Sequence, residues 1–577
     1  MTWKRLVEYS QIIVSLSVSN KLQTSSKQNS TSARHRIPDT PPLHPLPPHN
    51  KQQHTHQTLH RWLSTAFSFM PMKQALATTV VLLTTNLFPA ASQDLGFAEL
   101  FTTHNASVDE VCIDFPAASY LEGTFVLPSL GQFEMADEKF TGLLDGFGKL
   151  ARFTLSNQSL CYHSRMMDTG FYNESMHTGK VAPGLMFSET APPRNYSGLQ
   201  NIGGPNDNVF VNTYSLGVPG PGEQSHFRCV TDSQMSIEFD PLTLNMIGKK
   251  IKWEDKMDFG NLPIGSAHPL PHPHEAGCII NVHPQTAIYM LGHKVSVYKM
   301  CNDAPFSRKL IHAIKTPYMP YYHSWGLTAS TIVLPMMHFT LNFIDVMKGQ
   351  TLSKSFKDIQ GNDTTIHLMP IDGSAPTSVA LVGMALYYTH VVNAYDDVDA
   401  VTGHRIHVMD VIKFSNNPFN GDMADLAMYR NKTARDALDP KGGALGIPTR
   451  IVIDAVNMTA TAAALKGFDA AQKDPMAMME TDFPKINPNF SAQKYCLFWA
   501  VQWRTNYPKE ISYAQMGIIK YNVCTNEYLV WKKDNSYPRY VCTLEEGGGG
   551  FVISWAMTDF YLFYFLYHPF GLFLSCF

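Results

Sequence analysis

The sequence predicts an all-β fold, either a β-propeller or a large β-sandwich, on three observations. From about residue 95 to residue 545 the chain is a series of short strand-like segments separated by Gly, Pro, Asn and Asp. Aromatic residues make up 12% of the chain, and 37 glycines accompany 37 prolines, a composition typical of turn-rich β-proteins. Few segments have a helical pattern, which disfavours alternating strands and helices. The sequence has no strict repeat, so the propeller prediction does not depend on periodicity.

Individual strands are predicted from short alternating or β-branched segments. Residues 235–239 alternate apolar and polar side chains with the two-residue period of a half-buried strand. Residues 404–410 and 449–454 have similar β-branched patterns and are predicted to be strands as well. Two segments are predicted to be helical instead, residues 422–438 and residues 461–473.

Charge and cysteine spacing exclude several classes of protein. The formal net charge is -3 and charged residues make up only 16% of the chain, so no basic face for a nucleic acid is expected. The nine cysteines form no Cys-X-X-Cys pair, which disfavours a structural zinc site of the usual spacing. An odd number excludes complete pairing within the chain, which leaves a few disulfides possible if the protein is secreted.

The N-terminal region differs from the rest in composition. Residues 1–69 are rich in Ser, Thr, Gln, His and Pro, and we predict a disordered leader or sequence upstream of the true start. Residues 70–93 have the layout of a secretory signal peptide, with one lysine before a short apolar run that small residues close. Translation from Met70 or Met72 would direct the protein to the secretory pathway. Translation from Met1 would make the run a signal anchor or the leader a targeting peptide.

Two further features bear on location. Eight Asn-X-Ser/Thr sequons follow the apolar run and give modest support to a lumenal glycoprotein, at Asn105, Asn157, Asn173, Asn195, Asn362, Asn431, Asn457 and Asn489. At the other end, residues 551–577 are almost wholly apolar and aromatic. This tail is about long enough for a membrane span of ~17–20 residues. An unrelated tail joined to a truncated domain is an equally good explanation.

Three isolated histidines occupy similar settings. His323 lies between aromatic residues and before a turn-prone Ser-Trp-Gly-Leu-Thr segment, and residues 332–334 follow as a predicted strand. His268 lies in Gly265-Ser-Ala-His-Pro269, and His390 follows Tyr387-Tyr-Thr. Because neutral imidazole binds iron, zinc and copper, single histidines at strand ends are suited to a metal site assembled from several blades.

Two acidic residues are candidate partners for these histidines. A histidine that binds a metal needs its second ring nitrogen held by a carboxylate or a carbonyl group. Asp232 precedes a predicted strand, and Asp482 precedes Phe-Pro. Taken alone, each acid is better explained as a turn cap.

These segments together resemble the carotenoid cleavage oxygenase family, which includes retinoid isomerohydrolases and stilbene-cleaving relatives. The resemblance runs along roughly residues 120–545, and its motifs follow the family's order. They include Gly123-Thr-Phe-Val-Leu-Pro128, Leu143-Leu-Asp-Gly-Phe-Gly148, Gly203-Gly-Pro-Asn-Asp-Asn208, Ser266-Ala-His-Pro269, Tyr322-His-Ser-Trp-Gly-Leu-Thr328, Thr389-His-Val-Val-Asn-Ala-Tyr395 and Asp482-Phe-Pro-Lys-Ile-Asn487.

The resemblance implies a seven-bladed β-propeller, with a dome of helices and loops over one non-haem Fe(II) that four histidines hold. Three of these ligands would be His268, His323 and His390. Asp232 and Asp482 occupy positions where the family usually has glutamate, so a shorter acid would have to reach each histidine. His272 and His274 are rivals of His268, which fits the motif better; they are set aside for that reason.

The C-terminal region departs from the family pattern. The fourth ligand is expected in a final His-Gly strand, well downstream of an acidic turn that resembles Glu545-Glu-Gly-Gly548. His568 comes too soon after this turn to be assigned, and the fourth ligand stays unknown. A third carboxylate partner has no match near residues 537–540. The departure leaves open whether the last blade of this propeller, predicted over residues 95–550, is complete.

The resemblance implies a dioxygenase that binds an apolar polyene in a tunnel and adds O2 across one double bond, giving two aldehydes or ketones. The substrate would be a carotenoid or apocarotenoid, reached from a membrane surface. A retinoid isomerohydrolase is the alternative among enzymes. A catalytically inactive homologue that binds apolar ligands and lacks the fourth iron ligand is the alternative outside them.

Overall fold

The described part of the chain falls within one compact unit of a computed structural model, Phe88–Phe577. The structure describes residues 102–115, 122–156, 158–216, 226–257, 264–286, 292–419, 425–431, 433, 446–469, 471, 476, 480–502, 517–532, 537–544, 550–555 and 574–576. The predicted leader, the signal-peptide-like segment and most of the apolar tail, including His568, therefore lie outside the described residues.

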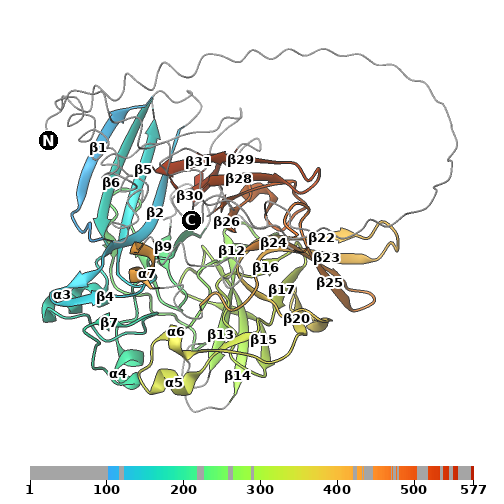
Figure 1. The fold of residues 1–577 in the computed structure, drawn as a ribbon, viewed down its shortest axis with the longest axis horizontal. Coiled ribbons are helices and arrows are strands. Elements are labelled where there is room, and N and C mark those ends of the chain that lie inside the picture. Colours follow the sequence, from blue (N-terminus) through green and yellow to red (C-terminus); the bar gives the residue numbers. More distant parts are fainter. Residues whose placement is uncertain are drawn as a thin grey trace, which may run out of the picture. The chain divides into compact units, whose positions relative to one another are not determined.

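The described residues form successive, largely antiparallel sheets (Figure 1), four of which have four strands. The first sheet has the order β1-β6-β5-β2 and contains β1 (Val108–Asp114), β2 (Gly123–Gln132), β5 (Phe147–Ser156) and β6 (Ser159–Met166). The next two are meanders in chain order. They contain β8 (Asn212–Ser215), β9 (Phe227–Val230), β10 (Ser236–Phe239) and β11 (Met246–Ile247), followed by β12 (Leu270–Pro271), β13 (Cys278–Thr286), β14 (His293–Cys301) and β15 (Lys309–Thr316).

Two further four-stranded meanders join into one eight-stranded sheet. The first contains β16 (Gly326–Leu327), β17 (Thr331–Pro335), β20 (Thr364–Pro370) and β21 (Thr377–Leu381). The second contains β22 (Tyr387–Val398), β23 (Arg405–Phe414), β24 (Ile447–Asp454) and β25 (Thr459–Ala464). Their outer strands, β21 and β25, pair in parallel.

The last meander contains β26 (Thr481–Lys485), β27 (Leu497–Gln502), β28 (Gly517–Asn522) and β29 (Tyr528–Lys532). The backbone of β30 (Tyr537–Leu544) then pairs with β31 (Gly550–Trp555) and β32 (Leu574–Cys576). Small sheets complete the strands, with β3 (Glu134–Met135), β4 (Glu138–Phe140) and β7 (Thr190–Ala191) in one and β18 (Phe339–Leu341) and β19 (Phe356–Asp358) in the other.

Helices are short in the described part of the chain. They are α3 (Gly170–Thr178), α4 (Gly198–Gly203), α5 (Phe343–Met347), α6 (Leu352–Ser355), α7 (Leu426–Arg430) and the 3-10 helix η5 (Pro488–Phe490). Among the described residues, no helix combines the length and the apolar character that crossing a bilayer requires.

The main hydrophobic core surrounds the middle meanders and holds the loop that carries His323. Tyr322 and Trp325 flank this histidine and are almost completely buried, and Val282 and Val297 from β13 and β14 belong to the same cluster. Each large apolar side chain that is fully buried contributes about 1.5–3 kcal/mol to stability. The loop is therefore fixed by packing on both sides of its histidine.

The described strands confirm most of the sequence predictions and correct one. β10, β23 and β24 cover the segments predicted around residues 235–239, 404–410 and 449–454. The predicted helix over residues 461–473 is wrong, because the alanine-rich segment forms β25, whose exposure alternates residue by residue. Pairing with β24 on one side and β21 on the other outweighs the helix preference of alanine. Of the predicted helix over residues 422–438, the described part contains α7.

A circle of antiparallel meanders of four strands is the architecture of a β-propeller. The all-β propeller prediction agrees with this arrangement. Seven blades, the dome and the incomplete last blade stay predictions.

Candidate metal centre

Three histidines from distant parts of the chain converge on one point. His268 Nε2 lies 2.9 Å from His323 Nε2, and His323 Nε2 lies 3.2 Å from His390 Nε2. One ring nitrogen from each histidine falls within 4.8 Å of the other two. His268 and His390 are 6% and 7% exposed, so the centre is largely shielded from water. The structure thus brings together all three histidines that the sequence singled out.

The sheet order explains this convergence. His268 comes just before β12, His323 just before β16, and His390 is the fourth residue of β22, so each belongs to the first strand of its meander or to the loop that enters it. β16 packs against β22, and β22 packs against β26. First strands that pack against one another place residues far apart in sequence around a common centre.

Each of the two predicted acids holds one of the histidines. Asp232 Oδ2 accepts a hydrogen bond from His323 Nδ1 at 2.7 Å, and Asp482 Oδ1 accepts one from His390 Nδ1 at 2.7 Å. The shorter aspartate therefore reaches the imidazole in both cases. Asp232 also accepts from the backbone N–H of Ala267, the residue before His268, so one carboxylate positions two of the three histidine segments.

The donor set fits a metal ion. Because a carboxylate only accepts hydrogen bonds, His323 and His390 donate through Nδ1 and, when neutral, present the lone pairs of Nε2 to each other. Two nitrogens that bind one metal at about 2.1 Å, with a right angle between them, lie about 3.0 Å apart. The separations of 2.9 and 3.2 Å agree with that geometry. A cation between these nitrogens would relieve the repulsion between their lone pairs.

Charges near the centre also favour a bound cation. Burial opposes protonation of His323, but the charge of Asp232 and the hydrogen bond to it outweigh this, so the pKa of His323 is raised. For His268, burial and the neighbouring His323 and His390 lower the pKa well below its ordinary value. Burial lowers the pKa of Lys485, on the same strand as Asp482, to about 7, which reduces the positive charge that would compete with a metal.

Two serine hydroxyls join the histidine segments, and sequence reasoning missed both. Ser266 Oγ donates to the carbonyl of His323 and accepts from the N–H of His268. Ser324 Oγ donates to the carbonyl of Thr389 and accepts from the N–H of Val391, the two residues that flank His390. The signal available in the sequence was a serine within two residues of two of the candidate ligands.

Tyr321 connects the centre to an aromatic cluster and was also missed. Its hydroxyl donates to Asp232 Oδ2, the oxygen that also accepts from His323. The ring of Tyr321 lies 5.2–6.1 Å from three phenylalanine rings of this cluster, Phe339, Phe356 and Phe419. Apolar surface therefore begins within one side chain of the metal centre.

Phe483 lies against the other side of the centre. Its ring centroid is 5.0 Å from that of His390, and 39% of the residue is exposed. Its φ angle is 54°, a conformation that is rare for a bulky residue and is often retained at functional sites. The same strand carries Asp482, and its pairing with β27 shifts register between Asp482 and Lys485.

The rival histidines do not join the cluster. His272 Nε2 lies 3.3 Å from a carboxylate oxygen of Glu275, and His274 Nε2 contacts the carbonyl of Ala329. The preference for His268 is confirmed in position. A fourth histidine is absent from the cluster as far as the described residues go, and the neighbourhood of residues 537–540 is described only as the backbone of β30.

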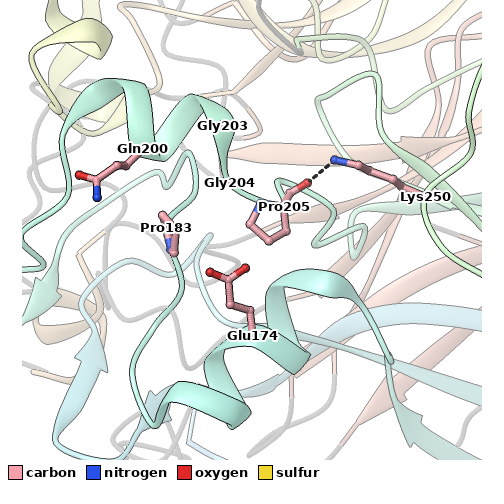
Figure 2. Close-up of a pocket in the computed structure, with 7 residues that line it drawn as sticks. All are labelled: Glu174, Pro183, Gln200, Gly203, Gly204, Pro205 and Lys250. Atoms are coloured by element: carbon pink, nitrogen blue, oxygen red, sulfur yellow. Dashed lines mark hydrogen bonds between the residues drawn. The ribbon is translucent and has the colours of Figure 1, made fainter.

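A separate cleft lies outside this centre and shares no residue with it. Its volume is about 450 Å³, and Figure 2 shows its lining: Glu174, Pro183, Gln200, Gly203, Gly204, Pro205 and Lys250. Lys250 Nζ donates to the carbonyl of Pro205. A cleft with charges of both signs and no converging titratable groups offers no chemistry comparable to that of the histidine cluster.

Comparison with known proteins agrees with this geometry. The family model of the retinal pigment epithelial membrane protein matches residues 114–559. The chain belongs to this family. Among curated relatives, rat β,β-carotene 15,15'-dioxygenase (Rattus norvegicus) is 22% identical, with 73% of this chain and 76% of the relative covered. Carotenoid isomerooxygenase of Galleria mellonella is 21% identical, with 73% of this chain and 78% of the relative covered.

Solved structures place this member of the family in the same fold. A variant of the Synechocystis apocarotenoid oxygenase is 16% identical and aligns with a TM-score of 0.62 over 80% of this chain and 90% of that one. The cobalt-substituted Synechocystis enzyme aligns with a TM-score of 0.60 at 15% identity, with the same coverage. The predicted propeller fold is confirmed, and the relatives are oxygenase enzymes that cleave carotenoids.

Proposed function

We propose that this chain is a non-haem Fe(II) dioxygenase that cleaves a conjugated double bond of a carotenoid or apocarotenoid into two carbonyl products. The observation that carries the proposal is the cluster of three Nε2 atoms, in which that of His323 lies 2.9 Å from that of His268 and 3.2 Å from that of His390. Carboxylates orient two of the three rings. Family membership and the carotenoid-cleaving relatives support the substrate class.

The proposed ligands are His268, His323 and His390. Ferrous iron bound there would supply open coordination positions for O2. Asp232 and Asp482 accept the Nδ1 protons of two rings, which fixes the ring orientation and makes Nε2 the nitrogen that the neutral tautomer offers to a metal. No nucleophile from the protein is needed for oxygen addition to a double bond.

Apolar surface next to the centre would position the substrate. Phe483 is an exposed residue whose ring lies beside His390, and the cluster around Tyr321 lies on the Asp232 side. A polyene held against such surfaces excludes water and fixes one double bond near the reactive centre. Access from a membrane surface stays a prediction, which sedimentation of the protein with carotenoid-loaded liposomes would test.

Iron content together with product analysis tests the proposal. Purified protein with an intact C-terminus should contain iron and convert a carotenoid or apocarotenoid into two aldehydes or ketones. His323→Ala should abolish iron loading, whereas His272→Ala should leave it intact because His272 pairs with Glu275 away from the cluster. Wild-type protein that binds no iron would refute the dioxygenase. A retinol product would indicate the isomerohydrolase, and ligand binding without turnover would indicate an inactive binding protein.

Substrate contact at Phe483 is testable separately from iron binding. Phe483→Leu retains the strained backbone position but removes the aromatic ring, so we expect kcat/KM to fall about tenfold with iron content unchanged. Phe490→Leu is the matched control, since Phe490 is exposed to a similar extent on η5 and lies at no histidine of the centre. Equal activity of the two variants would remove Phe483 from the substrate site.

A further inference from the structure

Six cysteines form three disulfides in the described part of the chain: Cys112–Cys161, Cys278–Cys301 and Cys496–Cys524. The seventh cysteine with a described side chain, Cys229, is buried and unpaired. Two of the bonds join residues that lie directly opposite each other in antiparallel strands, in the β1–β6 pair and in the β13–β14 pair. The fold therefore matches cysteines in space that are 23 to 49 residues apart in sequence.

Metal binding by reduced thiols is a poor explanation of these pairs. A glutamate lies near each of the first two pairs, Glu110 and Glu275, so each could in principle form a small cluster of metal ligands. Both glutamates already have partners, because Glu110 forms an ion pair with Arg152 and Glu275 forms one with Lys299. A disulfide accounts for each pair without leaving these ion pairs broken.

The asparagines of the sequons share a second property. All seven that the structure describes are exposed: Asn105, Asn173, Asn195, Asn362, Asn431, Asn457 and Asn489. They lie in loops, in turns and on short helices at sites spread along the chain. The eighth, Asn157, lies outside the described residues. A glycan is bulky and solvated, so each of these positions could carry one without disturbing the core.

The other asparagines behave differently. Among those that the structure describes, only Asn245, Asn416 and Asn526 are exposed, and the rest are buried or half-buried. Asn281 and Asn393 show the usual alternative, since both are buried and donate hydrogen bonds to backbone carbonyls. Exposure therefore accompanies the sequon and is not a general property of asparagine in this fold.

We propose that this chain matures in an oxidising secretory compartment as a protein with three disulfides and N-linked glycans on several of the seven exposed asparagines. Disulfides persist in that compartment and are rare in the cytosol, and the same compartment attaches glycans to Asn-X-Ser/Thr. The two observations are independent of each other, because the cysteine pairs and the sequons are made of different residues. Neither contributes a residue to the histidine cluster. The proposal also stands apart from the proposed enzymatic activity.

Peptide mapping without reduction tests the disulfides. The chain would be expressed in a eukaryotic cell once from Met1 and once from Met70, and free thiols would be alkylated before digestion. We expect linked peptides for all three pairs and an alkylated peptide for Cys229 after denaturation. Alkylation of Cys112, Cys161, Cys278 and Cys301 in both forms would overturn the oxidising compartment.

Glycosidase treatment tests the glycans in the same samples. Removal of N-glycans should increase electrophoretic mobility. Before that treatment, Asn195→Gln and Asn362→Gln should each have a mass lower than the wild type by one glycan, and the treatment should abolish the difference. These two side chains form no hydrogen bond with any described residue, so folding should tolerate the changes. Asn416→Gln is the matched control, exposed but outside a sequon, and should change nothing. A fully cytosolic protein with no mobility shift in either form would overturn the proposal.

Discussion

Acid–histidine hydrogen bonds occur in two regions of this protein, and their comparison shows what makes a metal centre. The central pairs are His323–Asp232 and His390–Asp482, both 2.7 Å between Nδ1 and the carboxylate. Two further pairs lie where β22, β23 and β24 run side by side, and we call them the hairpin pairs. They are His407–Asp396 at 2.7 Å and His404–Asp454 at 2.9 Å, also through Nδ1. The distances between Nδ1 and the carboxylate are therefore nearly the same in the two sets of pairs.

The difference lies at the second ring nitrogen. In the central pairs Nε2 faces another histidine, whereas the hairpin pairs belong to none of the three-residue clusters of potential metal ligands found among the described residues. The central partners are 91 and 92 residues apart, and the hairpin partners are 11 and 50 residues apart. An acid therefore fixes a histidine in either region, but only the meeting of first strands creates a site for a cation.

Among the residues that support the three histidines, the largest effect should come from removing a central carboxylate. Asp232→Asn removes the charge that raises the pKa of His323 and that holds its Nδ1 proton, so we expect iron affinity to fall about 10–100-fold. Competition with a chelator at fixed pH would measure the loss. Asp396→Asn is the hairpin control and should leave iron affinity unchanged. An equal loss in both variants would mean that carboxylates act through general stability rather than through the centre.

A smaller effect is expected from the serine bridge. Ser324→Ala leaves the N–H of Val391 and the carbonyl of Thr389 without their buried partner, which should lower the free energy of unfolding by about 1–3 kcal/mol. Iron should also dissociate faster, because these residues flank His390. Chemical denaturation and iron release would be measured together. Ser330→Ala, in the turn between β16 and β17, is the control. It should change the free energy of unfolding by no more than about 0.5 kcal/mol and leave the rate of iron release unchanged.

The sequence alone predicted most of the strands and the three histidine ligands, but not all the side chains that hold these histidines in place. Alternation and turn residues predicted β10, β23 and β24. The Ala-rich segment of β25 was wrongly predicted to be a helix, because its strand conformation depends on pairing with β21 and β24, which the local sequence does not show. His268, His323 and His390 were singled out by local context and by the family resemblance. Their partners Ser266, Ser324 and Tyr321 were not, since a hydroxyl close to a candidate ligand does not reveal in the sequence which distant segment it contacts.

Tyr321 should contribute less than the acid to which it is bound. Tyr321→Phe removes the hydroxyl that donates to Asp232 but keeps the ring packed against Phe356 and Phe419. Because His323 and Ala267 still donate to the same carboxylate, we expect a loss of iron affinity of only a few fold. Tyr318→Phe, which loses a hydrogen bond to the carbonyl of Met337, is the control and should leave iron affinity unchanged. A loss as large as that of Asp232→Asn would make the hydroxyl the main support of the carboxylate.

The smallest effect concerns the hairpin pairs and appears only in acid. The hydrogen bond from His404, with those from the backbone of Asn457 and Val456, lowers the pKa of Asp454 from 3.8 to about 2. A carboxyl whose pKa is depressed by folding stabilises the folded state above the unfolded pKa, and the contribution is lost as pH falls from about 4 through about 2. Asp454→Asn should flatten the pH dependence of the unfolding midpoint in that window, by a small amount because this carboxyl is in part accessible to solvent and therefore screened.

At neutral pH the same variant should bind iron as the wild type does. Thermal unfolding between pH 2 and pH 5, with chelator competition at pH 7, would measure both properties. A change in iron affinity at pH 7 would show that the hairpin pairs are coupled to the centre through β22, the strand that carries His390. Without such coupling, an acid–histidine pair in this fold stabilises the structure locally, and it contributes to a metal site only where Nε2 of the histidine faces another histidine.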